Sequence, residues 1–91
     1  MAVSERKNPT PISIRTLTNV TTSASGNIAA GLSASWIYIL SAWALGNNDY
    51  IILPYRSSTN DTWILHVTTL SGAAVANVTI DAVEFACFTK Q

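Results

Sequence analysis

The sequence predicts an all-β domain, a small antiparallel β-sandwich of jelly-roll type with about six or seven short strands. Three observations predict it. Apolar and polar residues alternate with a period of two in several short stretches, and clusters of Gly, Asn, Asp and Ser separate these stretches. No stretch shows the period of an amphipathic helix. The length of 91 residues fits one domain.

The first part of the chain contains two expected strands. Residues 1–10 are polar and lead into Pro9 and Pro11, so we expect a flexible lead-in before a single domain over residues 11–91. Residues 12–18 alternate strictly, and Ile12, Ile14 and Leu17 are expected on the buried side. Residues 28–33 form a second short strand, which Gly31 weakens.

Residues 36–45 are expected to form the central strand. One face carries Trp36, Tyr38, Leu40 and Ala42, and the other carries Ile37, Ile39, Ser41 and Trp43. Both faces are largely apolar, so both should be covered. The partner sheet covers one face, and a neighbouring subunit is a candidate to cover the other.

Further strands are expected at residues 50–53 and 62–70, and residues 74–80 and 83–88 are expected to form the last strand or a pair of strands. Pro54 should end the first of them or place it at a sheet edge. In the second, Trp63, Leu65 and Val67 fall on one face. The alternation slips phase between Ile80 and Val83, which predicts a bulge or tight bend at the two residues between them.

The composition favours a homo-oligomer. Hydrophobic residues make up 48% of the chain and charged residues 11%, whereas soluble domains carry about 25% charged residues. A domain of this length buries only a modest share of its own surface. We therefore expect other copies of the chain to cover apolar surface, most simply in a trimer or a dimer. The alternative is a monomer with a neutral surface rich in Ser, Thr and Ala.

The charge pattern argues against two classes of partner. The formal net charge is zero and the five cationic residues are scattered, so no basic stripe is present to bind nucleic acid. No basic amphipathic helix is apparent, and no apolar stretch approaches the ~18 residues of a membrane span.

The residue types that carry catalysis or metal binding are sparse. Cys87 is the only cysteine and His66 the only histidine, so the chain has no internal disulfide and no Cys/His zinc set. Strand alternation accounts for His66 without a catalytic role, and nothing resembles a nucleophile elbow. We expect no catalytic residues, no metal and no cofactor, and therefore a protein that acts by binding.

Aromatic residues beside polar loops suit sugar recognition, because a ring packs on a pyranose while Asn, Asp and Arg bond its hydroxyls. The candidate ligand-binding residues lie in two loops: Tyr55, Arg56, Asn60 and Asp61 in one, and Asn48, Asp49 and Tyr50 in the other. The Asn and Asp residues could also ligate calcium, although turn formation explains them. The three tryptophans lie in apolar runs, so a core or interface role is favoured for them.

Two stretches carry a family resemblance. Residues 25–32, followed by residues 36–43, are one, and residues 60–67, closing on residues 75–80, are the other. Together they resemble the small C-terminal head or tip domains of bacteriophage tail fibres and baseplate receptor-binding proteins. The resemblance covers roughly residues 17–89 and rests on short strands rich in Thr, Ser and Asn. It implies a β-sandwich homotrimer at the tail tip of a virion that binds host cell-surface glycans.

Two functions follow as expectations. The first is a non-enzymatic phage or virion tip domain that binds host carbohydrate as a homo-oligomer, with a trimer favoured. The alternative is a structural virion or baseplate assembly module that binds another protein.

Overall fold

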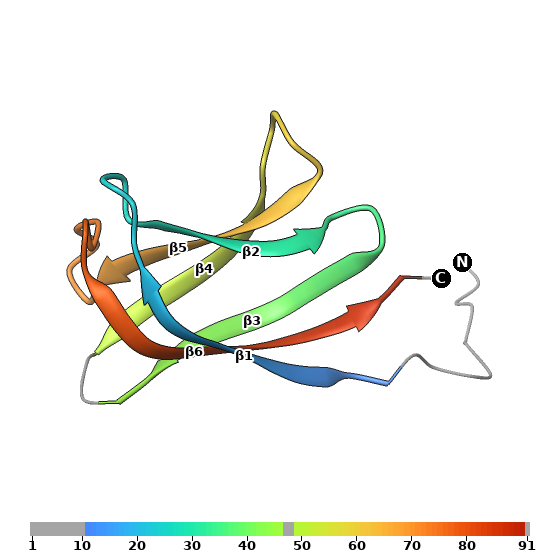
Figure 1. Cartoon of the computed structure of the whole chain (residues 1–91), viewed down its shortest axis with the longest axis horizontal. Helices are drawn as coiled ribbons and strands as arrows, with labels where there is room; N and C mark the ends of the chain where they lie inside the picture. The colour runs from blue at the N-terminus through green and yellow to red at the C-terminus, as the bar shows by residue number, and fades with distance from the viewer. Residues whose placement is uncertain (1–10, 47–48, 91) are drawn as a thin grey trace, which may run out of the picture.

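The computed structural model describes residues 11–46 and 49–90, so the expected lead-in at residues 1–10 lies outside the described part. Six strands follow one another along the chain (Figure 1): β1 (Ser13–Thr21), β2 (Asn27–Ser33), β3 (Ile37–Leu45), β4 (Tyr50–Arg56), β5 (Thr62–Thr69) and β6 (Thr79–Thr89). The described residues contain no helix that could cross a membrane. The all-β prediction is confirmed.

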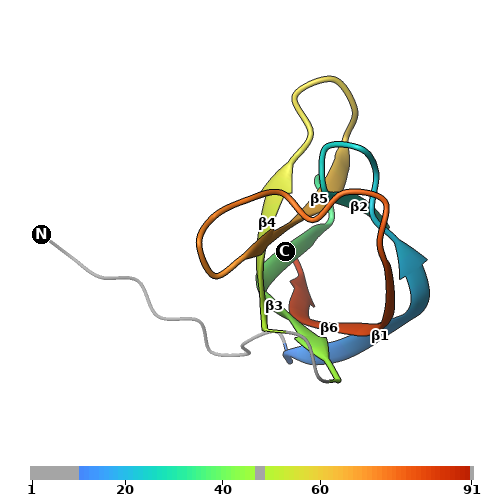
Figure 2. The same ribbon diagram turned by 90° about the vertical axis from the view of Figure 1, so that its left-hand side faces the viewer.

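The strands form a single antiparallel sheet in the order β1-β6-β3-β4-β5-β2. This sheet curls until its two edge strands, β1 and β2, approach each other, so that the molecule is a nearly closed barrel-like sheet (Figure 2). The two-sheet jelly-roll sandwich is not confirmed. Period-two alternation requires one buried face per strand, and both a sandwich and a curled sheet provide it.

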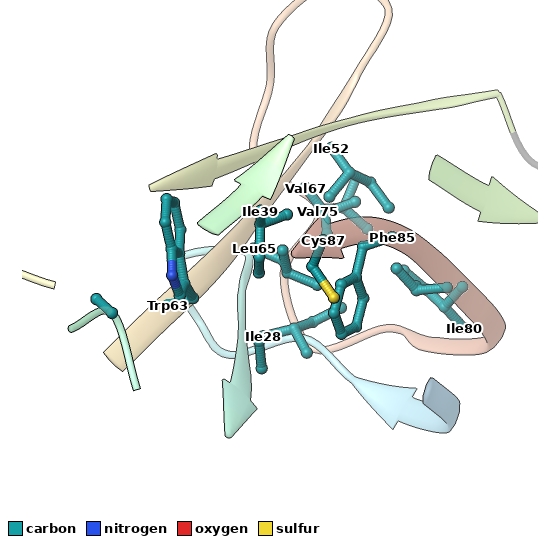
Figure 3. Packing of buried hydrophobic residues seen from close by; sticks show 13 residues of the cluster. Ile28, Ile39, Ile52, Trp63, Leu65, Val67, Val75, Ile80, Phe85 and Cys87 are labelled. Atoms are coloured by element: carbon teal, nitrogen blue, oxygen red, sulfur yellow. The ribbon is translucent and has the colours of Figure 1, made fainter. Parts of the chain in front are cut away.

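The interior of the curled sheet is filled with side chains (Figure 3). Leu65, Val67, Ile80, Val83 and Phe85 are at most 1% exposed and occupy its centre. Trp63, Leu65 and Val67 of β5 were predicted to share one face; this is confirmed, and the face points into the interior. Because the interior is packed, any ligand must bind on the outside or at an end of the barrel.

The prediction for the first strand was wrong at two positions. Ile12 and Ile14 are 61% and 56% exposed, whereas Leu17 packs against the core. Ile14 lies opposite Ala86 in β6, and directly opposite residues in an antiparallel pair share a face. The alternate residues of β6 face the core, which leaves Ile14 on the outside.

The phase slip in the last strand is present. Ile80 and Val83 are both fully buried, and the β1–β6 ladder omits the pair between Asn19 and Asp81. Asn19 also has a left-handed backbone, with φ of 51°. The strand continues through this irregularity as one element, which is one of the two possibilities that the sequence left open.

Residues 70–78 cross one end of the barrel, which faces the viewer in Figure 2. Val75 is buried there, and its N–H donates to the carbonyl of Val67 at 3.0 Å. The Thr22 N–H donates to the carbonyl of Val78 at 2.9 Å. Residues 74–78, which were expected to belong to a strand, therefore cover this end of the barrel instead. Ala74 forms an isolated bridge with Thr68 of β5.

The central strand contains a bulge that the sequence analysis did not anticipate. The register between β3 and β6 shifts between Ile39 and Ser41. Tyr38 and Leu40 point outward before the shift, 43% and 46% exposed. After it, Ala42 packs against the core, contrary to its expected place beside Tyr38 and Leu40.

β3 and β4 share one registered pair, Ala42 with Ile52. β4 continues through Pro54 to Arg56, although Pro54 was expected to end it or lie at an edge. Pro54 has no N–H to donate, which fits its position where β4 separates from β3.

Candidate functional site

Two connections meet at the end of the barrel opposite residues 70–78 (Figure 1, upper right). They are the β2–β3 turn at residues 34–36 and the β4–β5 loop at residues 57–61. The Ala34 N–H donates to the backbone carbonyl of Asp61 at 3.1 Å, and Ser33 Oγ donates to Asp61 Oδ2 at 2.7 Å. Asp61 therefore ties the two connections together. We call Ser33, Ser35, Trp36, Arg56 and Asp61 the loop-end site.

Asp61 is the charged centre of the loop-end site. Hydrogen bonding from the side chains of Ser35 and Ser33 lowers the pKa of its carboxyl below the ordinary value of 3.8. The Arg56 guanidinium, with Nη2 3.7 Å from Oδ1, acts in the same direction. The carboxylate is therefore ionised at neutral pH. Both partners of the ion pair are about half exposed, so solvent screens it.

Trp36 stands out of the β2–β3 turn with 67% of its surface exposed. Its backbone is fixed, because the Lys90 N–H donates to the Trp36 carbonyl at 2.7 Å and Lys90 Nζ donates to the Ala34 carbonyl at 2.8 Å. Its position in an apolar run had favoured a core or interface role for this residue. The missed signal is the pair of serines at positions 33 and 35, which are turn-forming residues directly before it.

The first group of predicted ligand-binding residues lies at this same end. Arg56 ends β4, and Tyr55 before it points outward with 42% of its surface exposed. Asn60 is exposed, and its N–H donates to Ser57 Oγ at 3.2 Å. Tyr55 and Asn60 therefore adjoin Arg56 and Asp61, the two charged residues of the loop-end site.

The second predicted group is at the far end of β4. Tyr50 is half-buried, packs against the core and lies opposite Thr69. Asp49 is exposed, and Asn48 lies outside the described residues. The seven residues of β4 separate the groups by about 20 Å at ~3.3 Å per residue. The structure therefore does not bring the two loops together into one site.

The other tryptophans have structural contacts. Trp63 is 4% exposed, and its Nε1 donates to the carbonyl of Ile37 at 2.7 Å. Tyr38 packs edge-on against it, with ring centroids 5.5 Å apart and an interplanar angle of 80°. Trp43 is half-buried, and its Nε1 donates to Glu84 Oε1 at 3.0 Å.

The single histidine and the single cysteine lie on opposite sides of the sheet. His66 faces outward and its Nδ1 is 2.7 Å from Asn27 Oδ1, while Cys87 is buried in the core. They therefore form no catalytic dyad. Over residues 11–46 and 49–90, no three His, Cys, Asp or Glu side chains gather as metal ligands would.

The loop-end site thus combines one exposed indole with an ionised carboxylate, a guanidinium and two hydroxyls. Comparison with known proteins adds no assignment, since no family model, no curated protein and no solved structure matches the chain.

Proposed function

We propose that the protein is a non-enzymatic carbohydrate-binding module whose loop-end site binds the sugar. The observation that carries the proposal is Trp36, a tryptophan 67% exposed on a turn that hydrogen bonds hold in place. An indole face packs on the apolar C–H face of a pyranose. An exposed aromatic ring beside fixed polar groups is the arrangement that such recognition requires.

The polar half of the proposed site supplies both kinds of hydrogen-bonding group. Arg56 donates through its guanidinium, and the carboxylate of Asp61 accepts. Asp61 is already positioned by Ser33 and by the backbone of Ala34, so little side-chain order remains to be lost when a ligand binds. Sugar hydroxyls would bond to these groups while the ring stacks on Trp36.

The proposed biological setting follows from the family resemblance. A glycan-binding site at one end of a small β-domain suits a phage tail tip that contacts a host surface. The site is exposed, so one copy would bind weakly, with Kd values of about 1 mM. Several copies in one particle would raise the avidity through effective concentration.

The test is binding of the full chain to a glycan array, followed by titration of any hit by NMR. Trp36→Ala should weaken binding at least about tenfold, since stacking is the main apolar contact. Leu70→Ala is the matched control, because Leu70 is 68% exposed but follows β5 at the opposite end. An array without any hit at millimolar sugar, or a Trp36→Ala variant that binds as the parent does, would refute the proposal.

The alternative is an assembly module of a virion or baseplate that binds another protein. The exposed Ile12 and Ile14 at the edge strand β1 favour it, because exposed apolar side chains can mark protein interfaces. Purification of the chain with a neighbouring virion protein, together with no glycan binding, would select this alternative.

A further inference from the structure

The outward face of β3 and β4 is apolar. In β4, every second residue from Ile51 onward points outward and is large: Ile51, Leu53 and Tyr55 are 39%, 56% and 42% exposed. Tyr38 and Leu40 of β3 also point outward and are 43% and 46% exposed. We call these five residues the outer apolar face. It is continuous with the outer residues of β5, because Leu53 lies opposite His66 and Tyr55 opposite Ile64.

The outer apolar face carries almost no charge. The sequences of β3, β4 and β5 contain no Asp, Glu, Lys or Arg except Arg56, which is at the end of β4 and pairs with Asp61. Glu84 of β6 borders the outward side of β3 opposite Trp43, beyond the five residues of the face, and it accepts a hydrogen bond from Trp43 Nε1. Soluble surfaces normally intersperse charges among apolar residues.

The size of the face is close to that of an interface. Five large side chains of about 200 Å² each, a little under half exposed, present roughly 450 Å² of apolar surface. The half-buried neighbours on β5 and β6, among them Ile64 and Phe88, extend it. A stable complex buries about 800 Å² per partner, of which roughly 56–65% is apolar, so the face alone supplies about the apolar area of such an interface.

The neutral character of the face points to a second copy of the chain as its occupant. A face that meets itself across a symmetry axis places like residues near like residues. Charged residues would repel there, and this face has none at its centre. A different partner is commonly selected by complementary charge, which the face does not offer. Tyr38 and Tyr55 supply hydroxyls that suit an interface rim.

We propose that the outer apolar face, centred on Leu53 and Leu40, is the surface through which copies of this chain associate. This inference gives the homo-oligomer that the composition predicts a specific interface. It does not depend on carbohydrate binding, because its test uses no sugar and changes no residue of the loop-end site.

The experiment is sedimentation velocity over a range of concentrations, without ligand. The parent chain should sediment as a multiple of its 9.7 kDa mass. Leu53→Lys should weaken association at least about tenfold, because it buries a lysine that has no charge partner at the interface. Leu40→Lys, from the neighbouring strand, should do the same.

Leu70→Lys is the control, since it makes the same charge change at a residue 68% exposed outside the face. It should leave the mass unchanged. Circular dichroism spectra and melting curves should show that all three variants are folded. A parent chain that stays monomeric at its highest soluble concentration would overturn the inference, and so would folded Leu53→Lys and Leu40→Lys variants that associate as the parent does. In either case glycan binding through Trp36 would still be open to its own test.

Discussion

The side chain of Trp63 in β5 bridges to β3, which shares only one registered pair with its neighbour β4, and this makes Trp63→Phe an informative change. The Lys90 N–H bonds to the carbonyl of Trp36, so in the alternating antiparallel pattern the peptide groups of Ile37 face away from β6, toward β4. β4 offers no registered partner there. The indole N–H of Trp63 replaces the missing donor from β4 and bonds to the Ile37 carbonyl.

The expected cost of Trp63→Phe has two parts. A part-buried carbonyl that loses the donor facing it costs about 1–3 kcal/mol. The smaller ring also leaves a gap in a site that is 4% exposed, for roughly 1 kcal/mol more. The sum is about 2–4 kcal/mol. For a domain of this length it corresponds to a fall in Tm of roughly 8–32 °C, at about 4–8 °C per kcal/mol.

The assay is urea unfolding followed by circular dichroism, at several protein concentrations because association adds to apparent stability. Trp43→Phe is the matched control, as it removes the same kind of N–H donor at a half-buried site. Its acceptor, the Glu84 carboxylate, lies on the outside where water can replace the indole, so the loss should stay below about 1 kcal/mol. Equal losses in the two variants would refute the bridging role of Trp63.

Two further predictions concern a turn and the loop-end site. Gly26→Ala should cost more than about 1–3 kcal/mol, the strain of its φ of +79°, because a Cβ would also lie 3.0 Å from the Val67 carbonyl oxygen. Gly72→Ala, with φ of +94° and nothing within 4 Å, should show the strain alone, and equal Tm losses would contradict this reasoning. The second variant is Asp61→Asn. Because the pKa of Asp61 is lower in the folded state than the unfolded value of 3.8, its ionised carboxylate stabilises the fold above pH 3.8. This stabilisation disappears as the pH falls through the folded-state pKa. The Tm difference between the parent and Asp61→Asn should therefore shrink below about pH 4, and a difference independent of pH would count against the Ser33 and Ser35 hydrogen bonds as its source.

Local alternation predicted the strands well, because it depends only on neighbouring residues. The inward positions of β5 and the slip between Ile80 and Val83 could both be read from the sequence. Strand order could not be read in this way. β6 lies between β1 and β3, a long-range pairing that no local pattern encodes, and the same alternation fits a sandwich or a curled sheet.

The errors at individual residues have local physical causes. Ile12 and Ile14 alternate like core residues, yet their register opposite β6 leaves Ile14 outside. Trp36 was treated as part of the central strand, although two serines just before it favour a turn. The composition indicated that some apolar side chains would be exposed, and the strand register determines which ones are.

The two loop candidates could have been separated from the sequence alone. Tyr50 and Tyr55 are an odd number of residues apart in one strand, so their side chains must point to opposite faces unless a bulge intervenes. The structure has Tyr50 against the core and Tyr55 exposed beside Arg56. A single strand can thus present only one of them to a ligand on the outer surface. The β4–β5 loop is therefore favoured as the binding loop, because Asp61 at its end is tied to the turn that carries Trp36.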